Sequence, residues 1–201
     1  IIFWVNNLDI YLEKFFYDKK KGWFLKDHKI CRGLYNYGRY PGAIVFLGSI
    51  IIYILSYFIE ELVVYRTTAM FLFLLMFIGA GIFINSIFKI YWERPRPKQI
   101  KEFGGKHDFV NVWMFGDGGR NSSFPCGHAS IGFYMIFPYF LLKDTNPQAA
   151  MIFLGLGLIY GFIVGLARMI QGGHFASDVM WSLGVMYFTG IILYYFMNPI
   201  L

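Results

Sequence analysis

The sequence predicts an all-α membrane protein, a bundle of six transmembrane helices whose first helix is partly missing from this chain. Of its 201 residues, 57% are hydrophobic and only 15% are charged, whereas a soluble domain carries roughly a quarter charged residues. The apolar residues are gathered into long uncharged runs. These runs cover residues 41–59, 67–88, 127–142, 149–166 and 179–197.

The lengths of these runs are those of membrane spans. A helix needs ~20 apolar residues to cross a bilayer, with a usual range of about 17–25. Four of the five runs satisfy this, and 127–142 is short but sufficient if it begins at a polar pocket. A soluble all-α core would not need five such runs in one small chain.

Residues 1–17, "IIFWVNNLDIYLEKFFY", are interpreted as the last turns of an earlier helix followed by an interfacial amphipathic segment. This partial helix brings the expected number of spans to six. The chain has no internal repeat and no low-complexity segment, so residues 1–201 are expected to form a single integral membrane domain.

Basic residues are concentrated on one face of the predicted bundle. If the spans alternate in direction, that face holds 18–40, 89–126 and 167–178. Of the 18 Lys and Arg residues, only Arg66 and Lys143 fall on the other face. The positive-inside rule would make the basic face cytoplasmic, whereas binding of anionic head groups would explain the same charge without regard to topology. A chain embedded in a membrane makes nucleic acid a remote partner.

Four of the five tryptophans also fall on the basic face, where their amphipathic rings suit a head-group belt. They are Trp23, Trp92, Trp113 and Trp181.

Three polar clusters lie at the ends of predicted spans on the same face, and polar residues in such places need a functional reason. They are "KIYWERPRP" at 89–97, "PCGH" at 125–128 and "ARMIQGGHFASD" at 167–178. Because the spans alternate, the three clusters are expected to meet at one end of the bundle. The loop 89–126 would then lie on the active-site side.

The residue types in these clusters suit phosphoryl transfer. Lys89, Arg96 and Arg168 can converge on one anion, and arginine forks match phosphate oxygens. Gly127 and His128 stand at a helix start, where anions are favoured. If the last helix begins early, His174 and Asp178 share a face, and a carboxylate on one imidazole nitrogen leaves the other nitrogen free to attack. Such a site needs no metal and no cofactor, because the cations can stabilise the phosphoryl charge.

Cys126 beside His128 suggests a thiol nucleophile next to a base. Cysteine-dependent phosphatases have an arginine six residues after the cysteine, and here that position is Gly132. The nucleophile interpretation therefore fails on its own motif. Cys31 and Cys126 fit no metal-ligand spacing, and nothing requires a disulfide between them.

The three clusters together resemble the type 2 phosphatidic acid phosphatase superfamily. Its pattern is a lysine, six residues and Arg-Pro; then Pro-Ser-Gly-His; then Ser-Arg, five residues, His, three residues and Asp. This chain matches all six charged or imidazole positions in order and spacing. They are Lys89, Arg96, His128, Arg168, His174 and Asp178.

The resemblance implies a role for each residue. His174 would form a phosphohistidine, Asp178 would orient it, and His128 would be the general acid for the leaving oxygen. The phosphate would be held by Lys89, Arg96, Cys126, Gly127 and Arg168.

Two residues depart from the family pattern. Cys126 and Ala167 each replace a usual serine, which weakens hydrogen bonding to the phosphate but removes no catalytic group.

A narrower resemblance, in "FPCGHASIGFYMIF" and "RMIQGGHFASDV", is to the bacterial lipid A phosphatases, especially the 4′-phosphatase group. It implies a multi-pass protein of the bacterial inner membrane, with its active site facing the periplasm. Lipid A 1-phosphate, phosphatidylglycerophosphate and undecaprenyl diphosphate remain alternative substrates.

Other interpretations account for single features. An anion channel or transporter would explain the cations but not two histidines with a spaced aspartate. A cytochrome could use His128 and His174 as haem ligands, which the neighbouring cations disfavour. His28 and His107 are interpreted as interfacial or packing residues. Arg94 is interpreted as a charge on the rim of the site.

Overall fold

The structure, a computed structural model, describes residues 7–119 and 122–199. Within these residues the regular structure is helical, and two isolated bridges are the only strand-like pairing. The helices are α2 (Leu8–Glu13), α3 (Lys29–Tyr37), α4 (Tyr40–Leu55), α5 (Arg66–Leu74), α6 (Lys89–Tyr91), α7 (Gly127–Phe133), α8 (Phe137–Leu142), α9 (Pro147–Ile170) and α10 (Ala176–Met197). A π-helical segment, Leu75–Phe88, joins α5 to α6. Short 3-10 turns cover Lys14–Phe16, Glu60–Tyr65, Pro97–Gln99, Lys101–Phe103 and Tyr134–Ile136.

The predicted all-α membrane fold is confirmed by the length and composition of these helices. In the described part of the chain four helical stretches are long and apolar enough to cross a membrane, and Gly127–Leu142 is a shorter apolar helix. The long stretches are Lys29–Leu55, Glu60–Tyr91, Pro147–Ile170 and Ala176–Met197. The predicted tail of an earlier helix falls largely on residues 1–6, outside the described residues, so the sixth span stays a prediction.

Local sequence explains where the helices bend and begin. The α7–α8 stretch is broken by the 3-10 turn and by Pro138 in the first turn of α8, where a proline is tolerated because its missing N–H is not needed. Helix α9 begins with Pro147 after Asn146, whose side chain accepts a hydrogen bond from the backbone N–H of Ala149 at 3.1 Å. This is the N-cap arrangement that favours a helix start.

Close packing of α7 on α9 sets the distance between two of the functional clusters. A Cβ on Gly132 would lie 2.9 Å from the Cα of Gly161, so small residues are needed where the two backbones meet. His128 near the start of α7 and Arg168 near the end of α9 are therefore carried on helices in direct contact.

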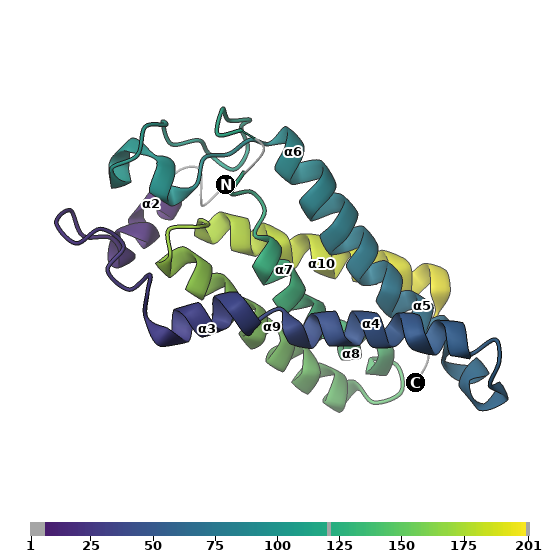
Figure 1. Cartoon of the computed structure of the whole chain (residues 1–201). Coiled ribbons are helices and arrows are strands. Elements are labelled where there is room, and N and C mark those ends of the chain that lie inside the picture. Colours follow the sequence, from purple (N-terminus) through teal and green to yellow (C-terminus); the bar gives the residue numbers. More distant parts are fainter. Residues whose placement is uncertain (1–6, 120–121, 200–201) are drawn as a thin grey trace.

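Figure 1 shows the two ends of the bundle, and the end at which α7 begins is called the functional end because it carries the three polar clusters. Helices α4 and α5 meet near the C-terminus, while α6 ends, α7 begins and α9 gives way to α10 at the opposite end. Large apolar side chains face outward along the spans, as a lipid environment requires. Examples are Ile44, Ile51, Ile152 and Phe188.

In the segment predicted to be interfacial, helix α2 turns its acidic side chains inward. In α2 the exposed side chains include Tyr11, while Asp9 and Glu13 are buried. The helix packs on α10 with its acidic face inward, because a buried arginine partner lies beneath it.

Trp23 is buried, whereas the prediction placed it in a head-group belt. It is 9% exposed and packs with Ile100, Phe103 and Phe175 in a second apolar cluster at the functional end.

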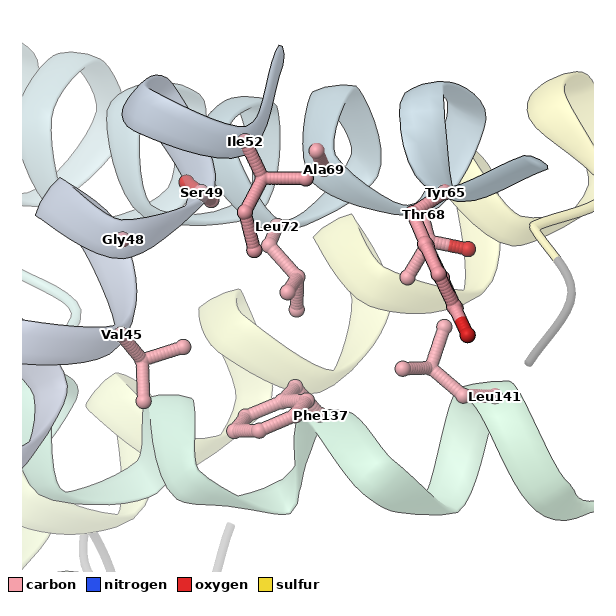
Figure 2. Close-up of a pocket in the computed structure, with 10 residues that line it drawn as sticks. All are labelled: Val45, Gly48, Ser49, Ile52, Tyr65, Thr68, Ala69, Leu72, Phe137 and Leu141. Atoms are coloured by element: carbon pink, nitrogen blue, oxygen red, sulfur yellow. The ribbon is translucent and has the colours of Figure 1, made fainter. Parts of the chain in front are cut away.

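An apolar pocket of about 310 Å³ opens between α4, α5 and α8 (Figure 2). It is lined by Val45, Gly48, Ser49, Ile52, Tyr65, Thr68, Ala69, Leu72, Phe137 and Leu141. Its lining has no charged side chain and belongs to the bundle end where α4 meets α5, away from the polar clusters.

Candidate active site

The three polar clusters meet at one end of the bundle, as the alternation of the spans predicts (Figure 1). Backbone hydrogen bonds tie each cluster to another. They run from Lys98 N–H to Gly172 C=O at 3.1 Å, from Cys126 N–H to Asp178 C=O at 3.2 Å, and from Ser123 N–H to Arg94 C=O at 2.8 Å. The loop segments therefore hold one another in register independently of any ligand.

His174 is buried in the short loop between α9 and α10, with its side chain 2% exposed. Its Nδ1 lies 2.5 Å from the backbone carbonyl oxygen of Ser123. A carbonyl only accepts hydrogen bonds, so Nδ1 carries the proton and Nε2 of the neutral ring keeps its lone pair. Burial, aided by the positive charges of Arg168 and Arg96, lowers the pKa of His174 to about 4 against the opposing effect of Asp178. The imidazole is therefore neutral at pH 7.

Asp178 lies behind His174 without a direct hydrogen bond to it. Its Oδ2 is 3.8 Å from His174 Nδ1, which is too long for a hydrogen bond but close enough to stabilise a positive charge on the ring when one forms. The same oxygen accepts the backbone N–H of Phe175 at 2.8 Å and so caps α10. Helix α10 begins at Ala176, after His174, so the early helix start that a shared helix face requires does not occur, although the two side chains lie 3.8 Å apart.

The three predicted cations lie close to this pair. Lys89, Arg96 and Arg168 lie within electrostatic reach of one another. A Cβ on Gly127 would lie 3.2 Å from Lys89 Nζ, so the first residue of α7 leaves room beside that ammonium group. The arrangement suits an anion held between side-chain cations and the N–H groups of a helix start.

His128 is stacked on Tyr35 of α3, with the ring centroids 5.0 Å apart and the planes at 17°. The guanidinium carbon of Arg168 lies 4.6 Å from the centroid of the same Tyr35 ring. Arg168 also donates to Gln171, whose side-chain NH₂ donates to the Cys31 carbonyl at 3.3 Å. Helix α3 thus contacts two residues of the site at once.

Two buried nitrogen atoms here have no hydrogen-bond partner among the described residues, His128 Nε2 and Arg168 Nε. Buried donors are rarely left unpaired in folded proteins. An oxygen-rich ligand between them would give both atoms a hydrogen-bond partner.

Cys126 is fully buried and free, as is Cys31. Burial raises the pKa of the Cys126 thiol to about 11. A thiol with that pKa is protonated at neutral pH and is a poor nucleophile.

Arg94 is not the predicted rim charge. Its side chain is fully buried. Its Nη1 lies 2.5 Å from Asp178 Oδ1, and its Nη2 lies 2.8 Å from Asp9 Oδ2. Sequence spacing contained no signal for this contact, nor for those of Ser123 and Tyr35. In the described residues, no group of three or more His, Cys, Asp or Glu side chains is placed to hold a metal ion.

Residues 68–200 match the PAP2 superfamily, which covers more than half of the chain and includes all three clusters. The chain belongs to the PAP2 superfamily. The resemblance inferred from the motifs is thereby confirmed, and with it the class of activity: this PAP2 protein is a phosphatase acting on a membrane lipid.

Individual PAP2 relatives are similar over different lengths. A lipid A 4′-phosphatase of Francisella tularensis subsp. novicida (strain U112) is 32% identical over 191 residues, which cover 94% of this chain and 82% of that protein. Phosphatidylglycerophosphatase B of Bacillus subtilis (strain 168) is 30% identical over 131 residues, covering 62% and 57%. A lipid A 4′-phosphatase of Rhizobium etli is 30% identical over 125 residues, covering 58% and 46%. No solved structure matches the chain.

Proposed function

We propose that this phosphatase removes the 4′-phosphate of lipid A through a phosphohistidine formed on His174. The observation that carries the chemistry is the contact between His174 Nδ1 and the Ser123 carbonyl, because it leaves the Nε2 lone pair available beside a cation cluster. The choice of lipid is supported by the similarity to a lipid A 4′-phosphatase over 94% of the chain.

In the first step the phosphate monoester enters between Lys89, Arg96 and Arg168, which offset its charge and that of the transition state. Nε2 of His174 attacks phosphorus, and the bond from phosphorus to the lipid oxygen breaks. Protonated His128 gives its proton to that oxygen, so a lipid alcohol leaves. The carboxylate of Asp178 stabilises the positive charge that develops on the His174 ring.

In the second step water hydrolyses the phosphohistidine. His128, now neutral, accepts the proton of the attacking water, and the bond from phosphorus to Nε2 breaks. The electron pair returns to Nε2, inorganic phosphate leaves, and His128 is protonated again for the next turnover.

The position of the site at one end of the bundle suits a lipid substrate. Acyl chains that stay in the bilayer confine the head group to the membrane surface, which favours productive orientation. A second candidate substrate is phosphatidylglycerophosphate, supported by the similarity to phosphatidylglycerophosphatase B. Lipid A 1-phosphate and undecaprenyl diphosphate are further candidates that the same assay can include.

The test is mass spectrometry of purified protein incubated separately with lipid A, phosphatidylglycerophosphate and undecaprenyl diphosphate. We expect loss of one phosphate from lipid A, with fragment ions that place the loss at the 4′ position. Turnover of another lipid instead would keep the mechanism and reject the lipid A assignment.

Variants test the mechanism separately from the substrate. His174→Ala should abolish turnover, and Arg168→Ala should lower it nearly as much. Rapid quenching of the parent enzyme should trap a phosphorylated residue at His174. A His174→Ala protein that still turned over would refute the phosphohistidine route.

We further propose that the site faces the periplasm from the bacterial inner membrane. Native Cys31 is 6% exposed and cannot report on this, so we would introduce Lys19→Cys at the site end and Gln148→Cys at the opposite end. An impermeant maleimide should label the first variant in intact cells and the second only after lysis. The reverse pattern would place the site in the cytoplasm.

A further inference from the structure

Arg94 is the centre of a buried polar network that joins α2 to α10. Its guanidinium donates to Asp178 Oδ1 at 2.5 Å, to Asp9 Oδ2 at 2.8 Å and to Ser177 Oγ at 2.8 Å. Its Nε donates to the Val110 carbonyl at 2.8 Å. All the side chains in this network are buried, so the interactions are weakly screened by solvent.

Asp9 completes the network from the N-terminal helix. Besides Arg94, it accepts the backbone N–H of Ser177 at 2.9 Å and the Ser177 hydroxyl at 2.5 Å. Ser177 directly precedes Asp178 in the first turn of α10. Asp9 therefore holds in place both Arg94, which pairs with Asp178, and the backbone of Ser177 next to Asp178.

The charges of the network explain why a second carboxylate is needed. Arg94 paired with Asp178 alone would cancel the negative charge behind His174. With Asp9 included, two carboxylates share one guanidinium, and a net negative charge remains beside the imidazole. Such a charge favours the positive ring that forms when Nε2 bonds to phosphorus.

Glu13 lies close to the same carboxylates. Burial and the neighbouring carboxylates Asp178 and Asp9 raise its pKa well above the ordinary value, which favours the uncharged form of its carboxyl group.

We infer that Arg94 and Asp9 are positioning residues that hold Asp178 and its charge behind His174. Helix α2, which carries Asp9, therefore contributes to the active site. This inference rests on His174 being the nucleophile, as proposed above. It gives α2 a role beyond packing. Asp9 lies 85 positions before Arg94 in the sequence and yet contacts it directly.

The test is Asp9→Asn, which keeps the shape of the side chain and removes its charge. Phosphoenzyme formation measured in a single turnover, and kcat, should fall by about 10- to 100-fold, the range known for carboxylates that support metal-ligating histidines in a similar way. KM should change by less than about twofold, because Asp9 does not face the phosphate. Asp18→Asn, an exposed aspartate in the next turn, is the matched control and should leave both parameters unchanged.

A double-mutant cycle separates positioning from a merely structural role. If Asp9 acts through Asp178, Asp9→Asn should cost little further activity once Asp178→Asn is present. If the two losses multiply instead, Asp9 acts independently of Asp178 and the inference is wrong. An unchanged kcat in a folded but less stable Asp9→Asn protein would also overturn it.

If Asp9→Asn does not fold, Ser177→Ala provides a second test of the same inference. This variant removes the hydroxyl that bridges Asp9 and Arg94 but leaves every charge in place. We expect kcat to fall about 3- to 10-fold with KM unchanged, and the loss to disappear in the Asp178→Asn background. An unaltered kcat, or a loss that persists in that background, would overturn the inference.

His174→Ala distinguishes failure of this inference from failure of the proposed function. An active His174→Ala protein rejects the mechanism itself. An inactive one, combined with Asp9 and Ser177 variants of parental kcat, rejects only the role of the network.

Discussion

Replacing Glu13 with glutamine should stabilise the protein at neutral pH, and more strongly as the pH rises. Glu13 is fully buried, and neither of its carboxyl oxygens has a hydrogen-bond partner among the described residues. Burial, followed by the charges of Asp178 and Asp9, raises its pKa well above 4.5. Glutamine has nearly the same shape as glutamate and carries no charge at any pH between 5 and 8.

The magnitude follows from proton linkage. Above pH 4.5 the unfolded chain releases the Glu13 proton while the folded protein keeps it, so each further pH unit costs the folded state about 1.4 kcal/mol. This continues until the pH reaches the folded pKa. Glu13→Gln should therefore be more stable than the parent, and the difference should grow by about 1.4 kcal/mol for each pH unit above 4.5 until the pH reaches the folded pKa.

The assay is equilibrium unfolding of parent and variant in detergent micelles at several pH values between 5 and 8. Glu102→Gln is the control, because its exposed carboxyl group meets solvent in both states. Infrared difference spectra at pH 5, above the ordinary pKa of a glutamate, should also show a protonated carboxyl band that Glu13→Gln lacks. A stability difference that does not vary with pH, or a parent without that band, would refute the reasoning.

Three further outcomes can be measured on the same protein. Cys126→Ser should keep or raise kcat, since a hydroxyl donates to phosphate better than a thiol, and a loss of about tenfold would contradict the assigned place of Cys126. Tyr35→Leu should lower kcat about 5- to 10-fold, whereas Tyr35→Phe should not, because only the ring contacts His128 and Arg168. As the pH falls from 6.5 to 4, the parent should lose about 3 kcal/mol relative to His174→Ala, because His174 is held neutral in the folded state. Parallel unfolding curves for that pair would contradict the lowered pKa.

The spans could be predicted because apolar length is a local property of the sequence. Residues 67–88, 149–166 and 179–197 all fall within observed helices that extend a few residues further. The 41–59 run differs more, since the helical stretch begins at Lys29 and ends at Leu55. Helix α3 is too polar to register as a span, and the tertiary contacts of α3 with α9 support it instead.

The site could be predicted only as far as its three clusters. Alternation of the spans brings those clusters to one end, whatever the details of packing. The roles of Ser123, Arg94 and Asp9 depend on contacts between segments distant in sequence, and no spacing rule encodes such contacts. The sequence RPRP suggests a loop with a positive rim that includes Arg94, yet the carboxylate partners of Arg94 hold it in the interior.

The buried network also changes how the charge of this end of the bundle is interpreted. The positive-inside rule concerns side chains that stay in water next to the bilayer. Arg94 is buried between two carboxylates, and Arg168 is buried against Tyr35, so neither belongs in that count. The exposed lysines at 19–21 do belong in it, but they lie in a loop at the substrate end, where anionic head groups would attract them equally. The charge of this end therefore has a buried part, to which the positive-inside rule does not apply, and an exposed part, whose side of the membrane labelling at Lys19→Cys would report.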